Sequence, residues 1–137
     1  MMPVGDVSDR LEDLMKSASS LILIAHGSKD PRWRKPFERL VGSLKSDLGE
    51  NGVFLSYMEF AEPTLMDAAA KAVNAGAKKV KVLPLFMAGG AHVDQDIPPQ
   101  VEAIKKKFPD LNVELLSPIG EHPKFVELIC QIAAQFA

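Results

Sequence analysis

The sequence feature that most constrains the fold is an alternation of short apolar segments with segments of helical periodicity. The apolar segments cover residues 21–25 (LILIA), 52–61 (GVFLSYMEFA), 79–87 (KVKVLPLFM) and 112–118 (NVELLSP). The first is short, apolar and partly β-branched, as is typical of a strand buried on both faces of a parallel sheet. We therefore predict four strands, each followed by a helix.

The segments that follow these strands carry apolar residues at helical spacing. The four predicted helical faces contain, in chain order, Phe37, Leu40, Val41, Leu44 and Leu48; Leu65, Ala69, Ala72 and Val73; Ile97, Val101, Ile104 and Phe108; and Phe125, Leu128, Ile129, Ile132 and Phe136. We expect Gly49 to end the first helix, Pro63 to open the second and Asp96 to cap the third. The predicted fold is an α/β three-layer sandwich, in which helices joined by right-handed crossovers flank a four-stranded parallel sheet.

Charge and hydropathy limit the partners of this chain. Its 137 residues include 25% charged residues and have a net charge of −2, so nucleic acid is not an expected partner. No apolar run approaches the roughly 18 residues that span a bilayer, and the acidic N-terminus is unlike a signal peptide. We expect a soluble, cytoplasmic protein with no membrane partner. Residues 1–20 are predicted to be a weakly amphipathic N-terminal extension, and residues 21–137 a single domain.

Three polar residues follow the first three predicted strands. His26 comes directly after the first strand, Glu59 falls at the end of the second, and His92 lies in the loop after the third. Parallel strands end at the same edge of a sheet, and ligands bind beyond that edge. Two imidazoles and a carboxylate converging there would be a suitable ligand set for a divalent transition metal such as Co, Ni, Fe or Zn.

Each of these polar residues also has a structural interpretation. A single histidine at a strand end is more often a hydrogen-bonded structural group than a ligand, and Glu59 could be a surface residue. Asp96 is best explained as a helix cap, Asp94 as a solvated or supporting loop residue, and His122 as a capping or turn residue. The paired Gly89 and Gly90 allow either close approach of a ligand or a tight turn.

Several other chemistries are disfavoured by the sequence. Cys130 is the only cysteine, so no disulfide within the chain and no cysteine metal cluster can form, and its apolar surroundings favour a buried structural thiol. No glycine-rich phosphate loop and no G-x-S-x-G nucleophile motif are present. Nucleotide-dependent and esterase chemistry are therefore not expected.

Four sequence motifs resemble those of the small CbiX-type sirohydrochlorin chelatases, of the class II chelatase family. They are AHGSKDP, MEFAEPTL, PLFMAGGAHVDQDIP and PIGEHPKF, and the resemblance extends over residues 21–137. It implies a flavodoxin-like, chelatase-like fold that inserts a divalent metal into the tetrapyrrole sirohydrochlorin without ATP, on the way to cobalamin or sirohaem. Co²⁺ is the favoured metal substrate, with Fe²⁺ or Ni²⁺ as alternatives. A non-catalytic metal or tetrapyrrole carrier on the same fold is the competing interpretation.

The resemblance also implies roles for individual residues. His26 and His92 correspond to the family's metal-binding histidines, and Glu59 to its acidic partner, so all three are the expected catalytic residues. The carboxylates of the macrocycle need cationic or amide partners, and Ser28, Lys29, Arg32 and Arg34 of the first loop are the candidates, with Gly89 and Gly90 also near the substrate. The alternative for each of the four is a solvated loop residue. Larger relatives contain two such halves, so a chain of this length is expected to form a homodimer with the active site between the copies.

Overall fold

A computed structural model describes residues 18–136, apart from the side chains of Ala91 and His92. Its elements are β1 (Ser19–Ala25), α2 (Pro31–Leu48), β2 (Val53–Tyr57), α3 (Leu65–Asn74), β3 (Lys79–Pro84), α4 (Ala91–Lys107), β4 (Asn112–Leu115), the 3₁₀ helix η1 (Ile119–Glu121) and α5 (Pro123–Ala134). The predicted alternation of strands and helices is confirmed. The predicted helix in the N-terminal extension lies outside the described residues.

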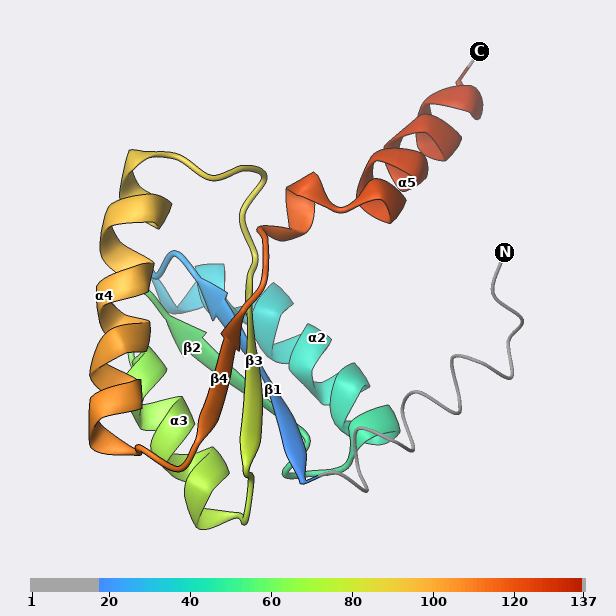
Figure 1. The fold of residues 1–137 in the computed structure, drawn as a ribbon. Helices are drawn as coiled ribbons and strands as arrows, with labels where there is room; N and C mark the ends of the chain where they lie inside the picture. The colour runs from blue at the N-terminus through green and yellow to red at the C-terminus, as the bar shows by residue number, and fades with distance from the viewer. Residues whose placement is uncertain (1–17, 137) are drawn as a thin grey trace.

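The four strands form one parallel sheet in the order β2-β1-β3-β4 (Figure 1). This order equals the first four positions of the flavodoxin-like order 2-1-3-4-5. The chain moves from β1 to one side to form β2 and then crosses to the other side to form β3. The direction of winding therefore reverses between β1 and β3, and the crevice at their carboxyl ends is where such sheets bind ligands.

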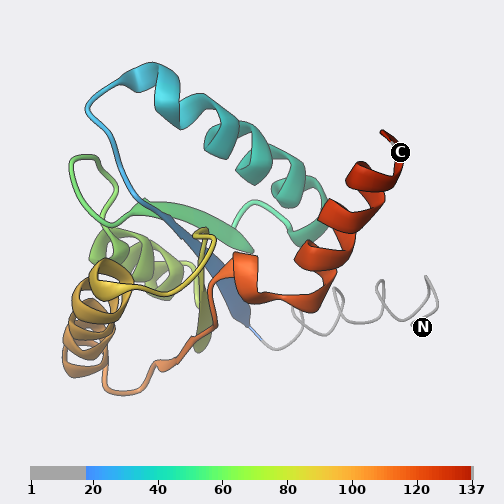
Figure 2. The same ribbon diagram turned by 90° about the horizontal axis from the view of Figure 1, so that it is seen from above.

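Helices cover both faces of the sheet, and alternate strand residues pack against them. Ile22, Ile24, Val80 and Val82 are fully buried under α3 and α4, whereas Leu23 and Val53 pack against α2 on the other face. Figure 2 shows α2 on one face of the sheet and α3 and α4 on the other. A parallel sheet needs this double cover, because its strands are apolar on both sides. The last helix, α5, follows η1 and stands off the sheet in both views.

The starts of α2 and α3 are fixed by side-chain caps. Asp30 accepts a hydrogen bond from the Arg32 backbone N–H at 2.9 Å, and Pro31 fills the first helical position. Thr64 and Asp67 form a reciprocal capping box at the start of α3. We expected Pro63 to open α3, and the helix instead begins at Leu65 because this box satisfies backbone donors of its first turn.

The prediction for the start of α4 was wrong. We expected Asp96 to cap a helix after a loop containing His92, but α4 begins at Ala91 with Gly90 as its N-cap, and the Asp94 N–H donates to the Gly90 carbonyl at 2.8 Å. Asp96 therefore lies inside the helix, and His92 lies in its first turn. Pro98 also lies inside α4, where its missing N–H removes one backbone donor from the helix.

The prediction that Cys130 is buried was also wrong. Cys130 is exposed, because α5 does not pack on the sheet as the other described helices do. The predicted strands were slightly misplaced as well: β1 begins at Ser19, and β2, β3 and β4 end at Tyr57, Pro84 and Leu115. Among the described residues, no helix combines the length and apolarity needed to cross a membrane.

Tyr57, the last residue of β2, reports on the packing of α2 against the sheet. It is 2% exposed, and the centre of its ring lies 6.1 Å from that of Trp33. Burial raises the pKa of the Tyr57 phenol, Glu38 raises it further, and Arg34 opposes the shift.

Tyr57 is the only tyrosine of the chain, so ultraviolet difference absorbance should give its titration directly. We expect its midpoint in the native protein to exceed the value of about 10 found in denaturant. Because the folded-state pKa is the raised one, the stability that the neutral phenol contributes is present below the unfolded pKa and is lost as the pH rises through the folded pKa. Glu38→Gln should lower the native midpoint and Arg34→Gln should raise it; equal native and denatured midpoints would contradict this packing.

Candidate functional site

His26 lies at the switch point between β1 and β3. It directly follows Ala25, the last residue of β1, and its side chain is exposed. Its imidazole packs edge-to-face against the ring of Phe86, with 4.7 Å between ring centroids. Phe86 follows β3 and is buried. The aromatic contact therefore holds the imidazole over the ends of the two central strands, with one side against a fixed wall.

Glu59 is placed beside His26 by the backbone. The pairing of β1 with β2 continues beyond the strands: the Met58 N–H donates to the Ala25 carbonyl at 2.8 Å, and the Glu59 N–H donates to the His26 carbonyl at 3.1 Å. Gly27 makes this approach possible. Its φ is +104°, and a Cβ atom there would lie 1.6 Å from the Glu59 carbonyl oxygen. The structure thus brings the backbones of two of the three predicted metal ligands side by side.

The third predicted ligand, His92, is placed only through its backbone. It lies in the first turn of α4, just after the N-cap Gly90 and close to Gly89. The connection from β3 to α4 carries this turn beyond the same carboxyl edge (Figure 1). Among the side chains that the structure describes, no group of three histidine, cysteine or acidic residues could hold a metal. The three-residue ligand set stays a prediction.

Two of the predicted rim residues, Ser28 and Arg32, make hydrogen bonds to Asp30, the N-cap of α2. Ser28 Oγ accepts a hydrogen bond from the Asp30 N–H at 3.1 Å. The Arg32 guanidinium donates to both carboxylate oxygens of Asp30 at 2.9 to 3.2 Å, and this fork lowers the pKa of Asp30. Lys29 is exposed, with its ammonium 5.8 Å from the centre of the Phe60 ring. Lys29 therefore lies in the loop as predicted, whereas Arg32 and Arg34 lie in the first turn of α2, with Arg32 paired to Asp30.

A cavity of about 440 Å³ lies at the same edge, over the ends of β3 and β4. Its lining includes Gly89, Asp94, Ser117 and Glu121. Of these residues, only Gly89 and Asp94 were predicted from the sequence to lie near the site. Glu121 was missed although it lies in one of the motifs quoted above, because η1 was not predicted. The volume of this cavity falls within the range of about 300–1,000 Å³ that is typical of ligand pockets.

The segment after β4 is anchored to the site by Gly120. Its N–H donates to the Phe86 carbonyl at 2.9 Å. A Cβ atom at position 120 would lie 1.8 Å from the Met87 carbonyl oxygen, so only glycine permits this contact. Phe86, whose ring contacts His26, is therefore bonded to η1 through its backbone carbonyl.

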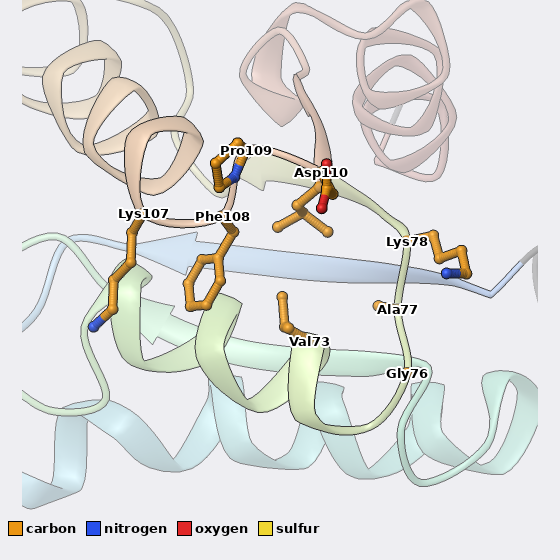
Figure 3. A pocket seen from close by; sticks show the side chains of 9 residues that line it. Val73, Gly76, Ala77, Lys78, Lys107, Phe108, Pro109 and Asp110 are labelled. Atoms are coloured by element: carbon orange, nitrogen blue, oxygen red, sulfur yellow. The ribbon is translucent and has the colours of Figure 1, made fainter.

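A second cavity, of about 350 Å³, lies at the opposite end of the sheet (Figure 3). It is formed by the chain segments that follow α3 and α4, with Val73, Lys78, Phe108 and Leu111 among its lining. None of the predicted site residues lies there. The predicted site and this cavity are therefore separated by the length of the strands.

Comparison with known proteins places the chain in a family. The sequence model of the CbiX family matches residues 20–135. A sirohydrochlorin cobaltochelatase of Sulfurisphaera tokodaii is 32% identical over 80% of this chain and 86% of that protein. A chloroplastic sirohydrochlorin ferrochelatase of Arabidopsis thaliana is 29% identical over 91% of this chain and 56% of that protein. A sirohydrochlorin cobaltochelatase of Methanocaldococcus jannaschii is 38% identical over 58% of this chain and 55% of that protein.

The solved structures agree with this placement. A CbiX protein of Marinobacter aquaeolei VT8 superposes with a TM-score of 0.75 at 32% identity, covering 85% of this chain and 95% of that one. The sirohydrochlorin chelatase SirB of Bacillus subtilis subspecies spizizenii, solved with cobalt, shares the fold with a TM-score of 0.73 at 22% identity, covering 87% of this chain and 51% of that one.

The four-stranded sheet and its flanking helices thus form a chelatase-type α/β domain, as predicted. The chain belongs to the CbiX family, which confirms the resemblance seen in its motifs. It spans about half the length of the Arabidopsis and Methanocaldococcus relatives.

The close approach at Gly27 predicts a specific sensitivity to substitution. Gly27→Ala should lower the free energy of unfolding by at least about 2 kcal/mol, because the new methyl group meets the Glu59 carbonyl and the backbone has a positive φ. Gly42→Ala is the matched control: it lies in α2 with open space around it, and should be neutral or stabilising by up to about 1 kcal/mol. Urea unfolding of both variants measures the difference, and equal stabilities would contradict the close approach of Gly27 to Glu59.

Proposed function

We propose that this protein is a sirohydrochlorin chelatase that inserts a divalent metal ion into the tetrapyrrole without ATP, in cobalamin or sirohaem biosynthesis. Co²⁺ is the favoured metal, with Fe²⁺ or Ni²⁺ as alternatives. The observation that carries the proposal is the backbone contact between His26 and Glu59 at the switch point of a CbiX-family domain. Both the S. tokodaii and the Arabidopsis relatives are named as sirohydrochlorin chelatases.

The proposed reaction needs a metal that is held by few, exchangeable ligands. His26 and His92 would present the ion through neutral imidazole nitrogens, which release it more readily than a set of thiolates would. Glu59 would complete the metal site or accept one of the two protons that leave the pyrrole nitrogens. The exposure of His26 supports this role, because one side of its ring packs on Phe86 while the side chain stays open to an approaching ion.

The substrate's carboxylates would meet the cations of the first loop and of the start of α2. Lys29 is exposed beside Phe60. Arg32 would bind a substrate carboxylate in place of the Asp30 carboxylate with which it is now paired. Ser28 would support this loop through its bond to the Asp30 N–H. Gly89 and Gly90, at the start of α4, would let the macrocycle approach the backbone near His92.

The proposed active unit is a homodimer in the cytoplasm. A single chain offers an open edge, and a tetrapyrrole between two such edges would be shielded from water on both faces. The span of about half the length of the larger relatives supports this arrangement.

The test is anaerobic incubation of the protein with sirohydrochlorin and Co²⁺, Fe²⁺ or Ni²⁺, followed by the absorbance change of metallation. We expect acceleration over the uncatalysed rate by at least one of these metals. His26→Ala and Glu59→Gln should each lower that acceleration by about 100-fold, since each removes a metal ligand or proton acceptor.

His122→Asn is the control, because His122 caps α5 through its Nδ1 atom and asparagine is also a good cap. It should keep the wild-type rate. Tight binding of sirohydrochlorin without turnover would instead identify a carrier, and full activity of His26→Ala would refute the proposed role of this histidine.

A further inference from the structure

Phe60 is an exposed aromatic residue beside the candidate site. It follows Glu59 directly, in the loop of residues 58–63 between β2 and the N-cap of α3. Phe60 is 63% exposed, whereas Met58, two residues earlier, is buried in the core. Single apolar residues are common on protein surfaces, so exposure alone would assign no role to Phe60. The backbone and the neighbours of this residue indicate one.

The backbone of Phe60 adopts a conformation that bulky residues rarely hold. Its φ is +62°, in the left-handed region that glycine and asparagine occupy most readily. Residues strained in this way persist only where the surrounding structure fixes them, and they cluster at active sites and ligand clamps. Glycine would form the same turn without strain, so a phenylalanine at this position indicates that the ring itself has a function.

The surrounding structure fixes the loop that carries Phe60 at both ends. The Glu59 N–H donates to the His26 carbonyl at 3.1 Å, and the Tyr57 N–H donates to the Pro63 carbonyl at 2.9 Å. The backbone of Phe60 is therefore held next to that of His26.

A cation lies over the ring of Phe60. The Lys29 ammonium is 5.8 Å from the ring centre, which is within the range of a cation–π interaction. Lys29 belongs to the loop after β1, and Figure 2 shows this loop and the loop after β2 projecting on the same side of the molecule. The ring thus offers an apolar surface with a positive charge beside it, which suits a flat ligand that carries carboxylates.

Met87, a second exposed apolar residue, lies on the other side of His26. It follows β3 and is 65% exposed. Because β1 lies between β2 and β3, the carboxyl ends of β2 and β3 are about 10 Å apart, with His26 between them. A macrocycle of four pyrrole rings is wide enough to span this gap, so that its centre would lie over His26 when one edge rests on Phe60.

We propose that the Phe60 ring stacks on one pyrrole ring of the tetrapyrrole substrate, while Lys29 binds a carboxylate at the edge of the same macrocycle. The inference rests on the proposed function for the identity of the substrate, and adds the residue that positions it. Stacking at one edge leaves the centre of the macrocycle open to the metal at His26. It also favours flat, conjugated substrates over flexible ones, so Phe60 is a specificity-determining residue.

The test is the binding of sirohydrochlorin without metal, measured anaerobically by quenching of the fluorescence of Trp33, the single tryptophan of the chain. Phe60→Leu keeps an apolar side chain but removes the ring, and should raise the dissociation constant about 10-fold, the scale of a lost aromatic stacking contact. Phe60→Tyr keeps the ring and should bind within about twofold of the wild type.

Phe108→Leu is the matched control. The Phe108 ring also has a lysine ammonium, that of Lys107, at 5.8 Å from its centre, but it lies in the cavity at the opposite end of the sheet (Figure 3). This variant should bind sirohydrochlorin like the wild type. A Phe60→Leu variant that binds like the wild type would overturn the proposal. A change in its oligomeric state, measured by sedimentation, would also overturn it, because Phe60 would then lie in a contact between protein copies.

Steady-state metallation separates this outcome from that of the proposed function. Phe60→Leu should raise the KM for sirohydrochlorin about 10-fold and leave kcat within about twofold, because stacking stabilises the bound substrate and the transition state equally. Binding that depends on the Phe60 ring without any metal insertion would support the stacking role and refute the proposed function. Metal insertion with an unchanged KM in Phe60→Leu would support the proposed function and refute the stacking role.

The backbone conformation of Phe60 is tested by its effect on stability. Phe60→Gly should have a higher urea midpoint than Phe60→Ala, the reverse of the usual order, because a positive φ strains alanine but not glycine. A higher midpoint for Phe60→Ala would show that residue 60 has an ordinary backbone conformation, and would overturn the inference that the loop holds the ring in place for binding.

Discussion

The parallel pairing of β1 with β3 is the constraint on which the rest of the structure depends. It joins two strands that are separated in the sequence by α2, β2 and α3, with Ile24 registered opposite Pro84 at their carboxyl ends. Because β2 lies on the other side of β1, the two central strands end on either side of one crevice. Their buried residues, among them Ile22, Val80 and Val82, hold the pairing in place on the face that α3 and α4 cover.

The candidate site follows from this pairing with few additional contacts. The Phe86 ring, just after β3, supports the imidazole of His26, just after β1. The backbone of Gly27 allows Glu59 to lie alongside, and Gly120 ties η1 to the same segment. The proposed chelatase activity needs a metal that is held loosely and then released, and the exposed imidazole of His26 on a rigid strand edge combines a fixed position with access for the ion.

The parts of the structure that depend on local pattern could be predicted from the sequence. The strands, the four described helices and the placement of His26 and Glu59 at one edge all follow from apolar periodicity and from the geometry of parallel sheets. The start of α4 was mispredicted because Asp96 resembles a helix cap, whereas the actual start at Gly90 has no side-chain cap to signal it. The exposure of Cys130 was mispredicted because an amphipathic pattern shows that a face will be buried but not which surface will bury it.

The central claim is that His26 is a metal ligand at the switch point between β1 and β3. X-ray absorption spectroscopy of the Co²⁺-loaded protein tests it most directly. We predict imidazole nitrogen scattering at about 2 Å from the metal, reduced by His26→Ala and unchanged by His122→Asn. A first shell made only of oxygen atoms, or a spectrum that is the same for the wild type and His26→Ala, would contradict the claim.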